Sequence, residues 1–239
     1  MTSASWPPLC IADDATFWAW RRWPEFSRWP DHESTLVVVP VAGLADWGLG
    51  HPLDAEETVL LSVLQAASVA REPGQSLLVT PPLRFVVGPE SNAAFAVDVP
   101  TAHALIEEVV RSVVASGFRR IVLFNASPWN EEIVSAAARD LRVALGARLF
   151  TLQLSGLGLD FHPTRQADRR TLQTLLTGLT GRMPGPAAAV SASPVFLQLA
   201  RTEAAAVIAS FGRQVAALLF EMQRHPPLAN HGRIGPAQP

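Results

Sequence analysis

The sequence predicts an α/β protein with a mainly parallel sheet that is covered by helices on both faces. Short apolar runs alternate along the chain with segments of helical periodicity, which is the pattern of this class. The composition is globular, since 49% of the 239 residues are hydrophobic and 17% are charged. We expect a Trp/Pro-rich arm over 1–30, a single α/β domain over 31–224 and a flexible tail over 225–239.

Four segments are typical of strands in such a sheet. The run Leu36–Val39 is β-branched and wholly apolar, as expected of a strand buried on both faces. Residues 76–80 and 121–124 have a similar character, and apolar residues alternate with polar ones over 150–154. Loops are expected over 40–53 and, with short extended pieces, over 83–99.

Five helices are expected between and after these strands. Asp54 and Glu57 have the spacing of a capping box at the start of the first helix. The helix after Pro100 carries apolar residues at helical spacing and ends at Gly117. The other helices are expected over 130–145, 168–177 and about 200–223.

Five tryptophans lie in the N-terminal arm, and we expect them to pack on the body of the protein or on a neighbouring subunit. They are Trp6, Trp18, Trp20, Trp23 and Trp29.

Charge and composition exclude several classes of function. The net charge is −2 and the pI about 6.3, so no basic surface is expected to attract nucleic acid or a membrane. No apolar run is long enough to predict a membrane span. The sequence has no lysine and no tyrosine, which excludes a lysine Schiff base and a tyrosine acid. Cys10 is the only cysteine, which fits a reducing compartment, and we expect a cytoplasmic protein.

Sites in parallel sheets form at the carboxyl ends of strands, which directs attention to the loops at 40–57 and 125–130. Neither loop carries a phosphate-binding or dinucleotide-binding glycine motif. The sequence also has no Gly-x-Ser-x-Gly elbow and no His-Glu-x-x-His pair. The common motifs of nucleotide-binding proteins, serine hydrolases and zinc proteases are therefore missing.

Three blocks of the sequence resemble motifs of the creatininase family. The stretch VVVPVAGLADWGLGHPLDAEE (37–57) is similar to the family's opening motif, Pro-Val-Gly-Ser-x-Glu-Gln-His-Gly-Pro-His-Leu-Pro-Leu-x-Thr-Asp. PPLRFVVGPESNAAF (81–95) and GFRRIVLFNASPWN (117–130) resemble the two blocks that follow in the family. The resemblance covers roughly residues 20–160 and implies a three-layer α/β/α fold, a metal-dependent amidohydrolase and oligomers, commonly hexamers.

The resemblance also implies two divalent metals that activate a water for attack on an amide. The metal-binding Glu of the first motif corresponds to Ala45, and its two His positions correspond to Trp47 and Gly50. The Asp that ends this motif corresponds to Glu56, the only conservative replacement.

The other ligand positions implied by the resemblance have changed as well. The His of the second block corresponds to Asn92, and the His of the third block to Ser127. Trp129 stands where creatininase itself has a Glu ligand, and residues 183–200 contain no His, Asp or Glu. Because Mn²⁺ and Zn²⁺ need carboxylate or imidazole ligands, we expect no metal cofactor and no catalysis.

We therefore expect a catalytically inactive creatininase-like protein, acting as a structural or regulatory subunit in a homo-oligomer or beside an active relative. Two alternatives remain open at this point. One is an amidohydrolase with one rebuilt site for Zn²⁺ or Mn²⁺, formed by Asp46, His51 and Glu56. The other is a metal-free protein that binds a flat small molecule in a remnant pocket. The pocket residues would be Trp47, Asn92, Asn125, Ser127, Trp129 and Asn130.

Several polar residues have simpler interpretations. His51 is expected in a solvated loop, and Asn125 and Asn130 are expected to shape their loop and cap the next helix. His162 with Asp160 and His103 with Glu107 are expected to be solvent-exposed pairs. Arg119 and Arg120 are each expected to form ion pairs with acidic residues at the surface.

Overall fold

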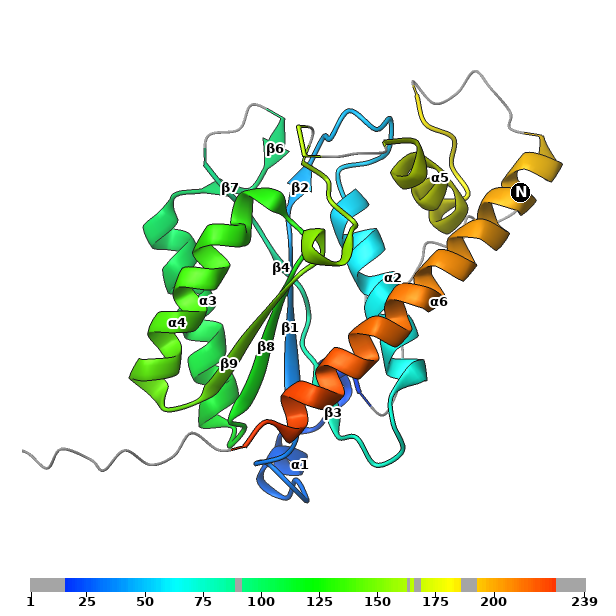
Figure 1. Ribbon diagram of the computed structural model, residues 1–239. Helices are drawn as coiled ribbons and strands as arrows, with labels where there is room; N and C mark the ends of the chain where they lie inside the picture. The colour runs from blue at the N-terminus through cyan, green and yellow to red at the C-terminus, as the bar shows by residue number, and fades with distance from the viewer. Residues whose placement is uncertain (1–15, 89–91, 163, 166–168, 186–192, 227–239) are drawn as a thin grey trace, which may run out of the picture.

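A computed structural model of the 239-residue chain describes residues 16–88, 92–162, 164–165, 169–185 and 193–226. Its centre is a parallel sheet in the order β3-β1-β8-β9, in which β4 extends the β3 side of β1 (Figure 1). The strands are β1 (Leu36–Ala42), β3 (Leu77–Val79), β4 (Leu83–Arg84), β8 (Arg120–Asn125) and β9 (Arg148–Gln153). The mainly parallel sheet predicted from the sequence is confirmed.

Helices cover both faces of this sheet and make three layers (Figure 1). One face carries α2 (Ala55–Ala70), α5 (Arg169–Thr180) and α6 (Pro194–Arg224), and the other carries α3 (Val99–Ala115) and α4 (Glu131–Leu145). Alternate residues of β1 supply the two cores, since Leu36 and Val38 pack on the α2 side and Val37 and Val39 on the α3 side.

Short strand pairs and 3-10 turns fill the connections. β2 (Leu44–Ala45) pairs antiparallel with β6 (Ala93–Ala94), and β5 (Val86–Val87) pairs parallel with β7 (Ala96–Val97). These are the short extended pieces expected over 83–99. The 3-10 turns are η1 (Trp18–Trp20), η2 (Pro128–Asn130) and η3 (Ser155–Leu157).

Strand β1 is longer than the sequence indicated. It continues to Ala42, whereas we expected it to end at Val39 with a loop from Pro40. The carbonyls of Val38 and Ala42 accept hydrogen bonds on the β3 and β4 side, so the Pro40 nitrogen faces that side too. There β3 has ended and β4 has not begun, so no ladder bond needs the missing N–H.

Capping residues explain two helix starts. The Asp98 carboxylate accepts a hydrogen bond from the Thr101 amide at 2.8 Å, and α3 begins at Val99. Ser193 accepts from the Phe196 amide at 3.1 Å, and α6 begins at Pro194, six residues before the expected 200. The expected helix from 168 appears as α5 from Arg169.

The capping box predicted for α2 is wrong. Asp54 occupies the N-cap position, but its side chain makes no capping hydrogen bond. Glu57 is buried instead of capping, and both of its oxygens accept hydrogen bonds from the Arg84 guanidinium, at 2.6 and 2.7 Å. An ion pair with β4 therefore replaces the expected local cap.

Small residues let α6 pack closely on α2 and α5. A Cβ atom added to Gly212 would lie 2.4 Å from Cβ of Ala66, and one added to Gly178 would lie 2.2 Å from the carbonyl oxygen of Ala200. Among the described helices, only α6 is long and apolar enough to cross a membrane. Its 18-residue apolar stretch has a mean hydropathy of 1.4, and 28% of that stretch is buried. Core helices of soluble proteins can have the same length and composition.

In the described part of the N-terminal arm, Trp18 and Trp29 pack on the body, as expected. Trp18 stacks on Phe26 at 4.3 Å between ring centroids, and both meet Phe118 in edge contacts. The Trp29 indole donates a hydrogen bond to the Thr35 hydroxyl at 2.9 Å. Trp20 and Trp23 are exposed, and Trp6, like residues 227–239 of the expected tail, lies outside the described residues.

Candidate functional site

The loops after β1 and β8 meet around the side chain of Glu56, which projects from the first turn of α2. The Glu56 carboxylate accepts hydrogen bonds from the Gly43 amide at 2.5 Å and from the Trp47 indole N–H at 2.8 Å. Glu56 has no exposed surface. This carboxyl group therefore holds the first loop from inside the protein.

Burial dominates the electrostatics of Glu56. Desolvation raises the pKa of Glu56 from 4.5 to about 7, although the hydrogen bonds from Gly43 and Trp47 work in the opposite direction. The Ser127 hydroxyl also works to lower this pKa. Its oxygen is buried and lacks the geometry of a hydrogen bond to any described residue. The Glu56 carboxyl group therefore titrates near neutral pH.

Glycine at position 43 permits this close approach of the two loops. A Cβ atom there would lie 3.0 Å from a Glu56 carboxylate oxygen, 3.0 Å from the Ser127 hydroxyl oxygen and 2.8 Å from a methyl group of Val86. Because the position is closed on three sides, a larger residue would separate Glu56 from the backbone amide that it binds.

Two tryptophans fill the space beside Glu56. The rings of Trp47 and Trp129 stack with centroids 5.6 Å apart and planes inclined by 22°, and Phe161 lies 6.2 Å from Trp47. Trp47 is only 7% exposed, and Trp129 is half-buried. His162 lies against the edge of Trp129 with centroids 5.0 Å apart. The two indoles that stand at implied ligand positions are thus in contact with each other.

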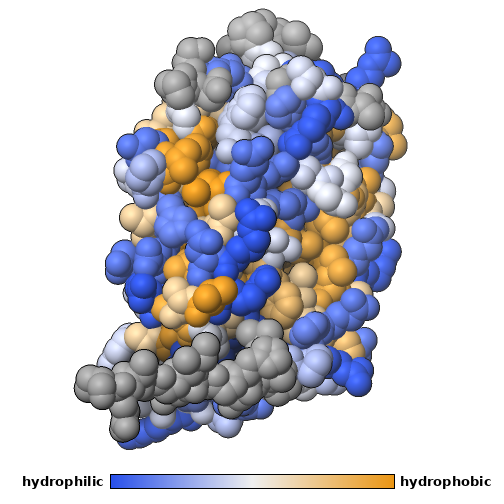
Figure 2. Space-filling view, turned by 60° about the vertical axis from the view of Figure 1, so that its left-hand side comes forward, coloured by the Kyte–Doolittle hydropathy of each residue, from blue (hydrophilic) through white to orange (hydrophobic). Residues whose placement is uncertain are grey.

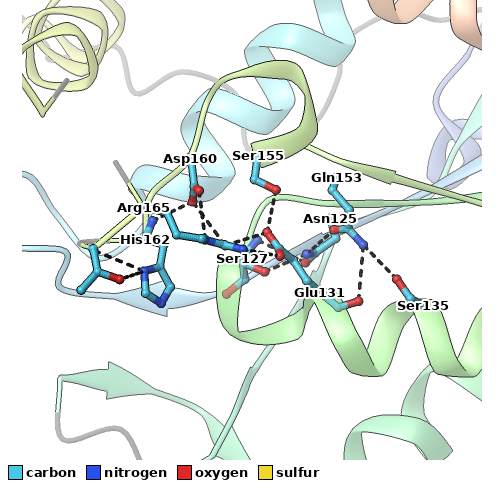
Figure 3. Close-up of polar contacts among 10 residues, drawn as sticks. Asn125, Ser127, Glu131, Ser135, Gln153, Ser155, Asp160, His162 and Arg165 are labelled. Carbon is cyan, nitrogen blue, oxygen red and sulfur yellow. Dashed lines mark hydrogen bonds and ion pairs between the residues drawn. The ribbon is translucent and has the colours of Figure 1, made fainter. Parts of the chain in front are cut away.

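The polar residues of the β8 loop are used to shape it. Asn125 donates to the Ser127 carbonyl and to the Gln153 side chain, both at 2.7 Å (Figure 3). Asn130 accepts from the Val87 amide at 3.0 Å and donates to the carbonyl of residue 85 at 2.8 Å. Asn130 has the N-cap position of α4 but makes no side-chain capping bond, so its predicted capping role is wrong and its loop-shaping role is confirmed.

A second polar cluster borders this loop and was not predicted. Glu131 forms two hydrogen bonds with the Arg165 guanidinium at 2.9 Å and accepts one from Ser155 at 2.6 Å (Figure 3). Arg165 also pairs with Asp160 at 3.1 Å. Partial burial works to raise the pKa of Glu131, but the bonds from Arg165 and Ser155 outweigh it and hold the pKa below its usual value. The sequence had drawn attention to Asp160 and to the adjacent Asn130, but not to Glu131 or Arg165.

The three residues of the alternative metal site are directed to different partners. Asp46 is exposed and accepts from the Gly48 amide at 2.8 Å, while Glu56 is bound inside the protein. His51 is half-buried, and desolvation lowers its pKa, so the prediction of a solvated His51 is wrong. Its Nε2 lies 3.5 Å from the Thr177 hydroxyl. The structure does not gather these three residues around one point.

The remaining candidate residues take structural positions. Asn92 is exposed and donates to the Asp46 carbonyl at 2.8 Å. His103 lies 3.8 Å from Glu107 and 3.4 Å from Asp140. Arg120 was expected to form a surface ion pair. Its guanidinium instead donates hydrogen bonds to the backbone carbonyls of Glu33 and His225, at 2.7 and 2.8 Å, and so links two segments of the chain.

Comparison with known proteins identifies the relatives of this chain. The family model for creatininase, described as creatinine amidohydrolase, matches residues 20–182. A proposed creatinine amidohydrolase from Bacteroides fragilis NCTC 9343 has a similar solved structure, with a TM-score of 0.65, 11% identity and coverage of 90% of this chain and 99% of that one. A search among curated protein sequences found no match.

Two solved forms of a mutant creatininase are also similar. The mutant in complex with creatine gives a TM-score of 0.63 at 15% identity, covering 88% of this chain and 99% of that one. The Zn-Zn type of the same mutant gives 0.63 at 15% identity, covering 89% and 100%. At these identities the structures establish the likeness of the folds.

The residues around Glu56 do not fit a divalent cation. Both Glu56 oxygens already accept hydrogen bonds, one from the Gly43 amide and one from the Trp47 indole. The other implied ligand positions present a methyl group, two indoles, a glycine, an amide and a hydroxyl. No three His, Cys, Asp or Glu side chains lie close enough to hold a metal within the described ranges, which exclude the segment at 186–192.

Proposed function

Since the chain belongs to the creatininase family, we propose that it is a non-catalytic member that serves as a structural or regulatory subunit. In this role it assembles with further copies of itself or with an active relative. In this proposal the chain keeps the fold of the family but has lost its reaction centre. Its function would then depend on surfaces that bind other subunits.

One observation carries this proposal: the only carboxylate at the implied ligand positions binds an indole instead of facing a cavity. The Trp47 indole occupies a position implied for a metal-binding His, and its N–H donates to Glu56 at 2.8 Å. Trp129 stacks on Trp47. A water-activating metal would have to displace the Trp47 ring and break its hydrogen bond.

The two alternatives have less support from the geometry. A rebuilt metal site would need Asp46, His51 and Glu56 to converge, and each has a different neighbour. A stacking pocket for a flat ligand would need open aromatic faces, but Trp47 is nearly buried and its ring is covered by Trp129 and Phe161.

Amide hydrolysis measured with and without added Mn²⁺ and Zn²⁺ tests the proposal. The purified protein should not hydrolyse creatinine or other cyclic amides above the rate without protein, while an active creatininase assayed in parallel should. Metal-dependent turnover that disappears in a Glu56→Gln variant would contradict it. That variant is the appropriate control because it removes the charge and keeps the side-chain size.

A further inference from the structure

Strand β9 forms one edge of the sheet, and its outer backbone groups face away from it. Within the described residues β9 pairs only with β8. The Arg148 amide donates to Arg119 and the Leu154 amide to Asn125, at 2.7 and 2.8 Å, so the backbone groups of even-numbered residues face β8. Those of residues 149, 151 and 153 therefore point outward.

The outer edge is only partly protected. The Arg142 guanidinium donates to the Leu149 carbonyl at 2.6 Å, which covers one acceptor at the beginning of β9. No hydrogen bond to the outward backbone groups of Thr151 and Gln153 comes from any residue that the structure describes. An open strand edge of this kind is a template for pairing with another strand.

Apolar side chains border this edge. Phe150 on β9 and one flank of α6, with Phe211, Leu218 and Met222, are half-buried against the core on the α6 side of the sheet. Contacts of Arg148 and Phe150 with His225 join the end of α6 to the start of β9. Figure 2, turned so that the left side of Figure 1 comes forward, shows an apolar band between hydrophilic side chains. Burial of such a band favours association.

The two ends of β9 carry opposite charges. A hollow of about 180 Å³ at its N-terminal end is lined by Arg142, Arg148 and His225, together with Leu149 and Phe150. At its C-terminal end lie the carboxylates of Glu131 and Asp160, both of which pair with Arg165 (Figure 3).

We propose that the β9 edge pairs antiparallel with β9 of a second copy of this chain, about a two-fold axis at Thr151. In this register the two copies of Thr151 face each other, and the outward amide of Leu149 meets the outward carbonyl of residue 153 in the second copy, while the Leu149 carbonyl keeps its hydrogen bond from Arg142. Phe150 then lies opposite Leu152 of the second copy on the apolar side.

Charge selects this direction of pairing. The antiparallel arrangement places the Arg142 and Arg148 end of one strand beside the Glu131 and Asp160 end of the other. A parallel arrangement would place like charges together. The inference does not depend on the absence of catalysis, because an active and an inactive chain could pair in the same way.

Sedimentation analysis of the full chain and two variants of Thr151 tests the pairing. The wild type should be dimeric or a multiple of dimers. Thr151→Pro removes an outward N–H that the contact with β8 does not use, and it should raise the dissociation constant about thirtyfold, since two symmetric hydrogen bonds are lost. Thr151→Val keeps the N–H and should associate like the wild type. A monomeric wild type, or a dimer unaffected by Thr151→Pro, would overturn the proposal.

A cysteine at the axis gives an independent test of register. Directly opposed residues in a hydrogen-bonded antiparallel pair have Cα atoms about 5.5 Å apart, within disulfide range. In a Cys10→Ser background, Thr151→Cys should therefore form a cross-linked dimer on mild oxidation. Val143 lies on α4 and is 85% exposed, and the control variant Val143→Cys should remain uncross-linked. Equal cross-linking of both variants would contradict the register.

Discussion

Replacing Glu56 by glutamine should remove part of the pH dependence of the protein's stability. The native state keeps the proton of Glu56 up to a pKa of about 7, whereas the unfolded chain releases it near the ordinary value of 4.5. Between these values the native state binds more protons than the unfolded state. This contribution is therefore fully present below pH 4.5 and is lost as the pH rises through 7.

The size of the effect follows from the two pKa values. A difference of one pKa unit corresponds to about 1.4 kcal/mol, so the rise from 4.5 to about 7 corresponds to a loss of about 3 kcal/mol in the free energy of unfolding. Glu56 has no exposed surface, so solvent screening does not reduce this figure. A loss of this size is a large part of the stability of an ordinary domain.

Urea denaturation of the wild type and Glu56→Gln, measured from about pH 5 to about pH 7.5, isolates this contribution. Over this range the difference between their free energies of unfolding should change by about 2 kcal/mol, in the direction that favours the variant at higher pH, because part of the full change lies outside the range. Glu132→Gln is the matched control, since it makes the same change of carboxylate to amide at an exposed position in the first turn of α4. A constant difference between wild type and Glu56→Gln would refute the reasoning.

Three further changes test other parts of the structure. Arg84→Met should destabilise the protein by about 1–3 kcal/mol, because it leaves the Glu57 carboxylate buried without its cation. Arg84 is partly exposed, which keeps this cost moderate. The double variant Arg84→Met/Glu57→Leu should recover stability, as measured by thermal denaturation. Gly212→Ala should cost about 1–3 kcal/mol, because the new Cβ would lie 2.4 Å from Ala66; an unchanged melting temperature would contradict this close packing. Because desolvation lowers the pKa of His51, its contribution is present above pH 6.5 and is lost as the pH falls, so His51→Gln should lessen the acid-side loss of stability in urea denaturation.

Local pattern was enough to predict most of the sheet and its helices. Strands with continuous apolar runs and helices with clear periodicity were found, because burial on both faces or on one stripe leaves a direct trace in the sequence. The extension of β1 through Pro40 was missed, since it depends on a gap between two neighbouring strands. The early start of α6 was missed because the capping role of Ser193 was not recognised.

The candidate site was predicted less completely. Comparison of motifs brought Trp47, Trp129 and Glu56 to attention, and the structure places them in one cluster. The burial of Glu56 and its protonation near neutrality depend on how two loops close around it, which no local pattern records. The pairs Arg84–Glu57 and Arg165–Glu131 join residues 27 and 34 positions apart, so spacing gave no signal for either.

The metal content of the purified protein tests the central claim most directly. Cells grown with added zinc and manganese should yield a chain with substoichiometric metal by elemental analysis, because the Trp47 indole and a buried, readily protonated Glu56 occupy the centre of the site. One or two equivalents of either metal, retained through dialysis in the wild type and lost in Glu56→Gln, would contradict the account.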